Sequence, residues 1–199
     1  MLAVARRHAT AQHNSTIHFK VVSGALARHL SIQATFDYID GMPRRGRSQL
    51  KDQIVFFVTT STKGHEKLFA DNRAKELLLD IIFERVAHFK ADLFGFVIMP
   101  NHIHLLVRIE GGGPKLANFM RDIKSLSARQ LFPERKGIWQ SRFDDVAIYT
   151  EDQFVVKLNY IHNNPVKAEL VSEAEQYEYS SARDWKAEIG RSIVKTEIF

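Results

Sequence analysis

The sequence contains no cysteine among its 199 residues. Disulfide bonds and cysteine-ligated zinc sites are therefore excluded, and the composition suits a reducing compartment such as the cytoplasm. Long apolar runs are also missing, because the longest fall far short of the roughly 20 residues that a membrane-spanning helix needs. The opening residues lack the extended apolar core of a secretory signal. We therefore expect a cytoplasmic protein.

Positive charge is concentrated in two segments of the sequence. Residues 1–48 carry seven Lys or Arg against two acidic residues, which accounts for the whole net charge of +5, so residues 49–199 balance to zero. Between residues 115 and 143, seven basic residues again stand against two acidic ones. Such a strip can lie along a phosphate backbone, and a solvated helix face explains it equally well.

Residues 1–41 show no strong periodicity and contain four histidines. Three interpretations are open: a mobile basic arm, an organelle transit peptide, or a segment upstream of a true start at Met42. We favour the third, because a basic stretch after Met42 leads directly into the first strand pattern. The predicted organisation is an uncertain extension 1–41, one domain 42–188 and a tail 189–199.

The central part of the chain alternates between strand and helix patterns. Asp71 is expected to cap the first helix and Pro114 to occupy the first position of the second. Thr150 and Gln153 form a capping box for a third helix, which should end near 163–164 because Pro165 follows. The predicted elements are strand 53–60, helix 71–90, strands 94–99 and 102–110, helix 114–132, a strand or strand pair over 138–148, helix 151–164 and a short closing helix in 177–185. This order predicts an α+β fold, an antiparallel β-sheet flanked by helices.

The most informative stretch is 94–110, where two apolar runs flank a break at Pro100-Asn101. The second run opens with His102-Ile103-His104. Because side chains alternate along a strand, His102 and His104 share one face while Ile103 points into a core. Residues two apart are separated by about 6–7 Å, so two imidazoles can converge on one metal ion. A polar pair in a strand otherwise suited to burial indicates a functional site.

A second candidate group lies on the helix 151–164. Tyr160 and Asn164 are four residues apart and therefore share one helix face. The histidine pair would hold a divalent cation, Asn164 would add an oxygen ligand, and the Tyr160 phenol would lie beside an ion-bound phosphate. Attack by the phenol would form a phosphotyrosine link and release a hydroxyl, provided that a nearby cation or base assists it.

These residues resemble the single-tyrosine HUH transposases, named for a His-hydrophobic-His motif. The matching motifs are Val-Ile-Met-Pro-Asn-His-Ile-His-Leu-Leu-Val at 97–107 and Tyr-Ile-His-Asn-Asn-Pro-Val-Lys-Ala at 160–168. Two further segments, at 139–143 and 179–185, extend a similarity that covers residues 42–185. The resemblance is strongest to the REP-associated tyrosine transposases, relatives of IS200-like transposases. Glu169 departs from the pattern, since relatives usually have Gly there, and residues 1–41 have no counterpart.

The resemblance implies a ferredoxin-like HUH transposase fold. It also implies an enzyme that cleaves and rejoins single-stranded, REP-like hairpin DNA through a covalent 5′-phosphotyrosine, using Mg²⁺ or Mn²⁺. Tyr160 would be the nucleophile, and His102, His104 and Asn164 the metal ligands. We expect a nucleoid-associated protein that binds DNA hairpins as a monomer or homodimer. The candidate DNA-binding residues are Arg44, Arg45, Lys115, Arg121, Lys124, Arg129, Arg142 and Trp139.

Several residues allow a structural explanation as well as a functional one. Trp139 either stacks on an unpaired base, worth about 1–3 kcal/mol, or is a buried strand aromatic. His162 should face away from Tyr160, and Asp144 and Asp145 are expected to be solvated loop acids. Two other functions stay open: a hairpin-binding module without cleavage, and a metallo-phosphodiesterase that uses bound water.

Overall fold

The computed structural model describes residues 54–186. The predicted boundary at Met42, the tail 189–199 and the candidate residues Arg44 and Arg45 lie outside this range. Within it, four antiparallel strands form one sheet in the order β2-β3-β1-β4. The elements in chain order are β1 (Val55–Ser61), η2 (Lys63–His65), α2 (Asn72–Phe89), β2 (Asp92–Ile98), β3 (His102–Arg108), α3 (Gly112–Leu131), β4 (Asp144–Ile148), α4 (Glu151–Lys167) and η3 (Ala174–Gln176).

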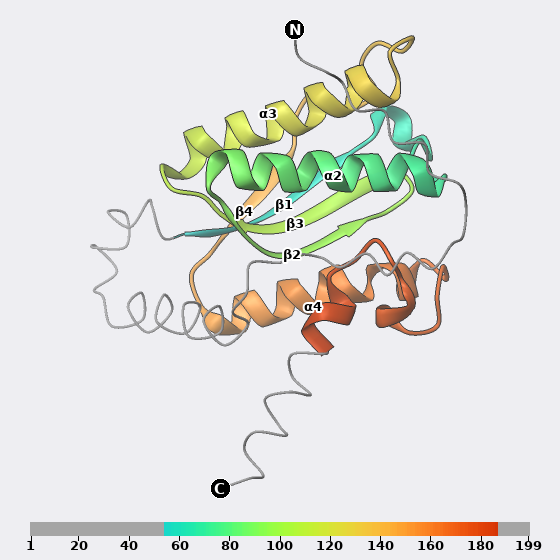
Figure 1. Cartoon of the computed structure of the whole chain (residues 1–199). Helices are drawn as coiled ribbons and strands as arrows, with labels where there is room; N and C mark the ends of the chain where they lie inside the picture. Colours follow the sequence, from blue (N-terminus) through green and yellow to red (C-terminus); the bar gives the residue numbers. More distant parts are fainter. Residues whose placement is uncertain (1–53, 187–199) are drawn as a thin grey trace, which may run out of the picture.

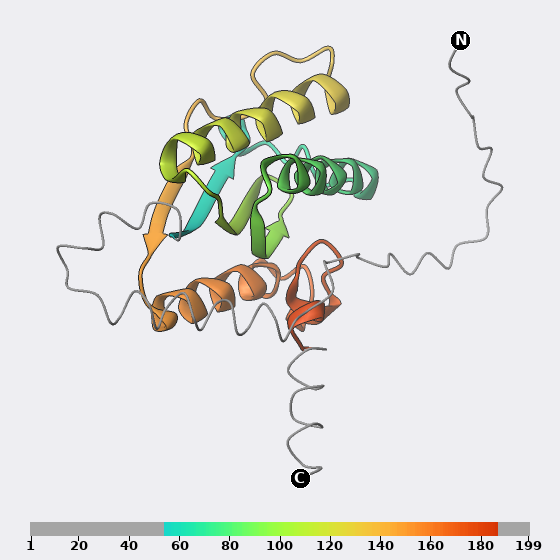
Figure 2. The same ribbon diagram turned by 60° about the vertical axis from the view of Figure 1, so that its left-hand side comes forward.

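Helices cover both faces of the sheet. Helices α2 and α3 pack together on one face, and α4 lies across the other (Figures 1 and 2). The predicted α+β fold and the order of its strands and helices are confirmed. Because β3 is an interior strand with both faces covered, all residues from 103 to 107 are buried. No helix within residues 54–186 is long and apolar enough to cross a membrane.

The predicted starts of α3 and β4 are wrong. Helix α3 begins at Gly112, so Pro114 is its third residue rather than its first. Proline is tolerated there because the N–H groups of the first helical turn have no partner within the helix. Residues 138–143 form no strand; an isolated bridge pairs Trp139 with Thr62, and the Gln140 N–H donates to the Ser61 carbonyl of β1 at 2.9 Å. Strand β4 itself begins at Asp144.

Helix α4 starts as predicted but continues past Pro165. The Thr150 hydroxyl accepts a hydrogen bond from the Gln153 N–H at 3.2 Å, which confirms the N-cap. The helix then runs through Pro165 to Lys167, so the predicted end at 163–164 is wrong. Proline removes one backbone donor, but its ring is buried against the rest of the domain. Beyond Pro165 the i to i−4 hydrogen bonding of the helix continues, since the Ala168 N–H donates to the Asn164 carbonyl at 3.0 Å.

The end of α4 is a Schellman motif whose left-handed residue is Glu169. The Leu170 N–H donates to the Pro165 carbonyl, and the Glu169 N–H donates to the Val166 carbonyl, both at 3.0 Å. Glu169 has φ +56°, in the left-handed region where glycine is favoured. The structure therefore explains why glycine suits this position.

Replacing Glu169 with glycine should stabilise the protein. The left-handed conformation costs an L-residue about 1–2 kcal/mol, and glycine removes this cost. The greater conformational freedom of glycine in the unfolded chain offsets part of the gain in stability. We expect urea unfolding to show a net gain of about 0.5–1 kcal/mol. Glu169→Ala is the matched control, because it removes the carboxylate but leaves an L-residue in the left-handed backbone conformation. An equal gain from both variants would contradict the backbone explanation.

Candidate active site

Strand β3 presents its two histidines to the face of the sheet that α4 covers. The ring centroids of His102 and His104 are 4.8 Å apart, and the ring planes are inclined by 73°. His102 is half-buried, whereas His104 is only 4% exposed. Ile103, fully buried, points to the opposite face. The predicted alternation is confirmed, and it places both imidazoles side by side.

Both ring nitrogens of His104 are accounted for if Nε2 binds a metal ion. Thr59 of β1 lies directly opposite His104 in the antiparallel register, with its Oγ1 2.8 Å from His104 Nδ1. His104 Nε2 is buried and has no hydrogen-bond partner among residues 54–186. A buried polar atom without a partner costs about 1–3 kcal/mol, which a metal ion at Nε2 would remove. Metal-bound imidazoles usually have their other nitrogen held by a hydrogen bond.

The neighbouring His102 is held in the same way, by the residue before it. Its Nδ1 lies 2.7 Å from Asn101 Oδ1. The Asn101 amide nitrogen donates to the His65 carbonyl at 3.4 Å, which fixes the amide with its oxygen toward the ring. Since an amide oxygen only accepts, Nδ1 carries the proton and Nε2 keeps its lone pair.

Both imidazoles are in the protonation state that metal binding requires. Burial lowers the pKa of His104 to about 3, and the charges of His102 and Lys157 act in the same direction. Burial also lowers the pKa of His102, and a hydrogen bond with the Asn164 side chain opposes this shift. Each ring is therefore neutral at pH 7 and free to donate a lone pair.

Replacing Thr59 with valine should weaken metal binding without removing a ligand. Valine keeps the shape of the side chain but cannot hydrogen-bond to His104 Nδ1, so the ring loses its fixed tautomer and orientation. Loss of such an outer partner typically costs about 10–100-fold in metal affinity. Calorimetric titration with Mn²⁺ measures the change. Thr60→Val, on the opposite face of β1, is the control, and equal losses in both variants would contradict the role of Thr59.

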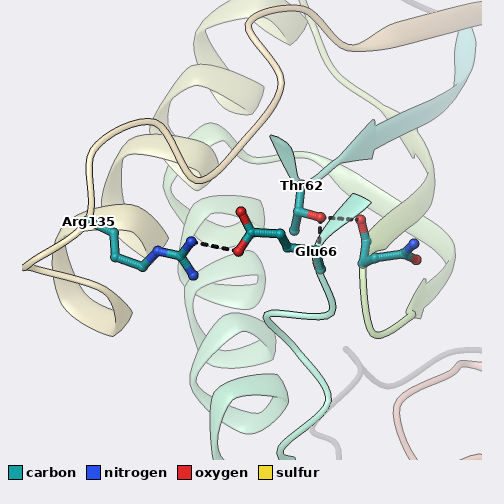
Figure 3. A network of polar contacts seen from close by, with 4 residues as sticks. Thr62, Glu66 and Arg135 are labelled. Carbon is teal, nitrogen blue, oxygen red and sulfur yellow. Dashed lines mark hydrogen bonds and ion pairs between the residues drawn. The ribbon is translucent and has the colours of Figure 1, made fainter. Parts of the chain in front are cut away.

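The turn before His102 is anchored by a polar network that starts at the end of β1. The Asn101 carbonyl accepts from the Thr62 N–H at 2.8 Å and from the Thr62 hydroxyl at 3.1 Å. The same hydroxyl is 2.7 Å from the Glu66 carbonyl, and the Glu66 carboxylate pairs with Arg135 at 2.6 Å. Figure 3 shows Thr62 between these partners. The network holds Asn101, and thereby the ring of His102, in place.

Helix α4 brings Tyr160 to the histidines. The helix approaches β2 closely at Gly95, where a Cβ atom would lie 2.7 Å from Leu158 Cδ1. The Tyr160 ring then packs edge-on against His104, with centroids 5.2 Å apart, and against Phe57 at 5.8 Å. The Tyr160 side chain is still 41% exposed, so the phenol can be reached from solvent.

Asn164 could add an amide oxygen to the two imidazole nitrogens. It follows Tyr160 by one helical turn, and its side chain lies close enough to His102 to act on the pKa of that ring. No group of three or more His, Cys, Asp or Glu in the described part of the chain could hold a metal ion. The protein donors expected from the sequence are two imidazole nitrogens and one amide oxygen. These suit a six-coordinate divalent ion whose remaining positions take phosphate oxygens and water.

The structure separates the basic strip of α3 from this site. Lys115, Arg121 and Arg129 are exposed on α3, which covers the face of the sheet opposite α4 (Figure 1). Arg142 is exposed in the segment that precedes β4. Lys124 instead donates to the carbonyls of residues 140, 141 and 142 at 2.6–3.4 Å and so anchors that segment. DNA binding by the exposed residues stays a prediction.

The stacking alternative for Trp139 is wrong in this structure. Its side chain is 6% exposed, and its indole N–H donates to the buried Ser127 hydroxyl at 2.9 Å. Its ring stacks on Phe69 with centroids 5.1 Å apart. Trp139 therefore has no free face for a base, and it fixes the segment after α3 against the core.

Three other residues near the motifs have structural or solvent-exposed positions. His162 is buried, as expected for a side chain facing away from Tyr160, and its Nε2 is 2.9 Å from the Ser181 hydroxyl. Ser181 also accepts from the Phe96 N–H, so this contact ties α4 to β2. Asp144 and Asp145 are exposed as expected, but they belong to the edge strand β4 rather than to a loop.

Sequence reasoning missed Phe57, Thr59, Asn101 and Lys157. Phe57 and Thr59 are two residues apart in β1, so their shared face could have been recognised. Their position beside His104 depends on the pairing of β1 with β3, which the sequence does not reveal.

A sequence model of the family described as "Transposase IS200 like" matches residues 49–164, more than half of the chain. The chain belongs to the IS200-like transposase family. A Haemophilus influenzae protein named "Putative REP-associated tyrosine transposase" is 32% identical to this transposase over 151 residues. The match covers 64% of this chain and 86% of the relative. The resemblance to REP-associated tyrosine transposases is thus confirmed, and the protein is an enzyme of this type.

A solved structure supports the fold. A REP-associated tyrosine transposase bound to a REP hairpin superposes on this transposase with a TM-score of 0.59 at 22% identity. The superposition covers 66% of this chain and 78% of the other. It confirms the antiparallel sheet flanked by helices.

Proposed function

We propose that this transposase cleaves and rejoins single-stranded DNA at REP-like hairpins through a covalent 5′-phosphotyrosine at Tyr160. The observation that carries the proposal is the packing of the Tyr160 ring against His104, 5.2 Å between centroids, within one chain. The buried Nε2 of His104, which has no partner among the described residues, supports a metal ion beside the phenol. The REP hairpin bound to the structural neighbour supports the choice of substrate.

The proposed reaction needs few groups from the protein. His102 and His104 would hold Mg²⁺ or Mn²⁺ through Nε2, and Asn164 would hold it through its amide oxygen. When bound, the ion supplies Lewis acidity at a phosphate oxygen. Tyr160 Oη forms a bond to phosphorus while the P–O3′ bond breaks. The phenol loses one proton and the departing 3′ oxygen gains one, so water is not consumed.

The phosphotyrosine replaces the cleaved phosphodiester bond with another, so the rejoining step needs no external energy source. A 3′-hydroxyl attacks the same phosphorus, the bond to Tyr160 Oη breaks, and the phenol regains its proton. Because one chain supplies both histidines, the tyrosine and the amide, the arrangement supports cleavage by a monomer. A homodimer would not be needed to complete the site. Action on chromosomal hairpins would place the protein with the nucleoid in the cytoplasm.

The direction of cleavage tests the proposal. The full chain is incubated with Mn²⁺ and a single-stranded oligonucleotide that contains a REP-like hairpin, labelled at either its 3′ or its 5′ end. We expect the 3′ label to migrate with the protein on a denaturing gel and the 5′ label to appear on a free fragment with a 3′-hydroxyl. EDTA should prevent both products.

Other outcomes identify the alternatives. Cleaved DNA without a protein adduct would favour a phosphodiesterase that uses water. Hairpin binding without cleavage at any Mn²⁺ or Mg²⁺ concentration would favour a binding module. Retention of the 5′ label on the protein would reverse the proposed polarity.

A further inference from the structure

One narrow stripe of α4 carries two lysines besides the proposed nucleophile and ligand. Lys157, Tyr160, Asn164 and Lys167 follow one another at spacings of 3, 4 and 3 residues. At 100° per residue these positions fall within an arc of about 80°. The stripe borders the buried face of the helix, so its side chains lie at the edge of the contact with the sheet.

Both ammonium groups rest on aromatic rings of the site. Lys157 Nζ lies 4.7 Å from the centroid of the Phe57 ring, which itself stacks on His104 at 5.3 Å. Lys167 Nζ lies 5.4 Å from the centroid of the Tyr160 ring. The two positive charges therefore flank the phenol along the helix, and Lys157 is near enough to His104 to act on it electrostatically.

Neither lysine has an acidic partner in the described range. The ion pairs found among residues 54–186 involve other cations. The acidic residues of α4 are Glu151 and Asp152, in its first turn, where they stabilise the helix N-terminus. Asp144 of β4 lies opposite Thr59 and is exposed on the same face of the sheet, so one acidic residue borders the site. A divalent ion at the histidines would add two positive charges to those of the two lysines, and an anionic phosphate would balance this excess.

A purely structural explanation covers only one of the two lysines. Lys167 is in the last turn of α4, where a positive charge stabilises the helix C-terminus. Lys157 is in the middle of the helix, so the helix dipole does not account for it. Its ammonium group instead lies over the Phe57 ring, which also contacts Tyr160.

We propose that Lys157, assisted by Lys167, binds the non-bridging oxygens of the scissile phosphate and orients that phosphate for attack by Tyr160. This inference rests on the proposed function, since it concerns the same phosphodiester. An ammonium group is a compact donor that binds phosphate as a point charge. It also neutralises the charge that builds up on the phosphate oxygens during attack.

Lys157→Met tests the inference because it keeps the aliphatic stem on Phe57 and removes the charge. Two quantities are measured on the full chain: the Mn²⁺ affinity without DNA, by calorimetry, and the rate of adduct formation with the 3′-labelled hairpin at saturating Mn²⁺. We expect Mn²⁺ to bind about threefold more tightly, because a nearby like charge is gone. We expect the adduct to form at least about tenfold more slowly.

These opposite changes separate phosphate binding from a structural role, which would weaken metal binding and cleavage together. Lys157→Arg should keep most of the wild-type rate, since it keeps the charge. Arg73→Met, on α2 across the sheet, removes a remote charge and should change neither quantity. An unchanged adduct rate in Lys157→Met, or a parallel loss of both quantities, would overturn the inference while leaving the proposed function intact. A wild-type protein that forms no adduct would overturn both.

Discussion

Replacing Tyr160 with phenylalanine is expected to abolish the covalent protein–DNA adduct. Phenylalanine keeps the ring that packs on His104 and Phe57, so the metal site and the position of α4 should not change. Only the oxygen that forms the bond to phosphorus is lost. Removal of a nucleophile commonly lowers a rate on the order of 10⁴-fold or more, so the adduct should fall below detection on a denaturing gel with 3′-labelled hairpin DNA.

Tyr149→Phe is the matched control for this experiment. Tyr149 is also an exposed tyrosine, 37% accessible, but it lies ahead of the first turn of α4. Its adduct yield should equal that of the wild type. An adduct that persists in Tyr160→Phe would disprove the nucleophile assignment. Cleavage that continues without an adduct would show that water, rather than the phenol, attacks the phosphorus.

His104→Ala is expected to abolish metal-dependent cleavage by removing the more buried of the two imidazoles. The structure surrounds this ring with Thr59 at Nδ1, Phe57 on its face and Tyr160 at its edge, and leaves Nε2 without a partner among the described residues. Loss of an outer partner already costs about 10–100-fold in metal affinity, so loss of the ligand should cost more than about 100-fold. Mn²⁺ titration by calorimetry, in the absence of DNA, measures this directly.

His88→Ala provides the control for histidine removal. His88 is exposed in the last turn of α2, on the other side of the sheet, so its loss should leave Mn²⁺ affinity unchanged. Thermal unfolding checks that His104→Ala is folded. Removing the ring leaves a cavity, but it also removes a buried nitrogen without a partner, and the two effects on stability oppose each other. Undiminished Mn²⁺ binding by folded His104→Ala would disprove the proposed metal site.

The fold was predictable where local patterns and local chemistry agree. Apolar alternation marked β3, helical periodicity marked α2, and Asp71 does cap α2 by accepting from the Ala74 N–H at 3.2 Å. The errors arose where tertiary packing overrides local preference. Pro165 would end an isolated helix, but its buried ring allows α4 to continue to Lys167. Residues 138–143 have strand-like composition, yet they are held by Trp139 and Lys124 as an irregular segment.

The candidate site was likewise predictable from the sequence only in part. The spacing of His102 and His104 and the spacing of Tyr160 and Asn164 each follow from the geometry of one strand or one helix. That the two pairs meet depends on the close packing of α4 at Gly95, which involves residues more than 60 positions apart. Phe57, Thr59 and Lys157 join them only because β1 pairs with β3 in one particular register. The basic strip of α3 lies away from the candidate site because α3 and α4 cover opposite faces of the sheet.

The sequence by itself therefore determined the family, the order of the elements and the residue types available for phosphoryl transfer, because these depend on short-range periodicity and on motifs. Only the tertiary structure decided which of these residues share a site. Strand register, helix docking and burial arise from contacts between distant segments. Those contacts give His104 its buried, unpartnered Nε2 within the described chain, place Lys157 beside it, and enclose Trp139 in the core.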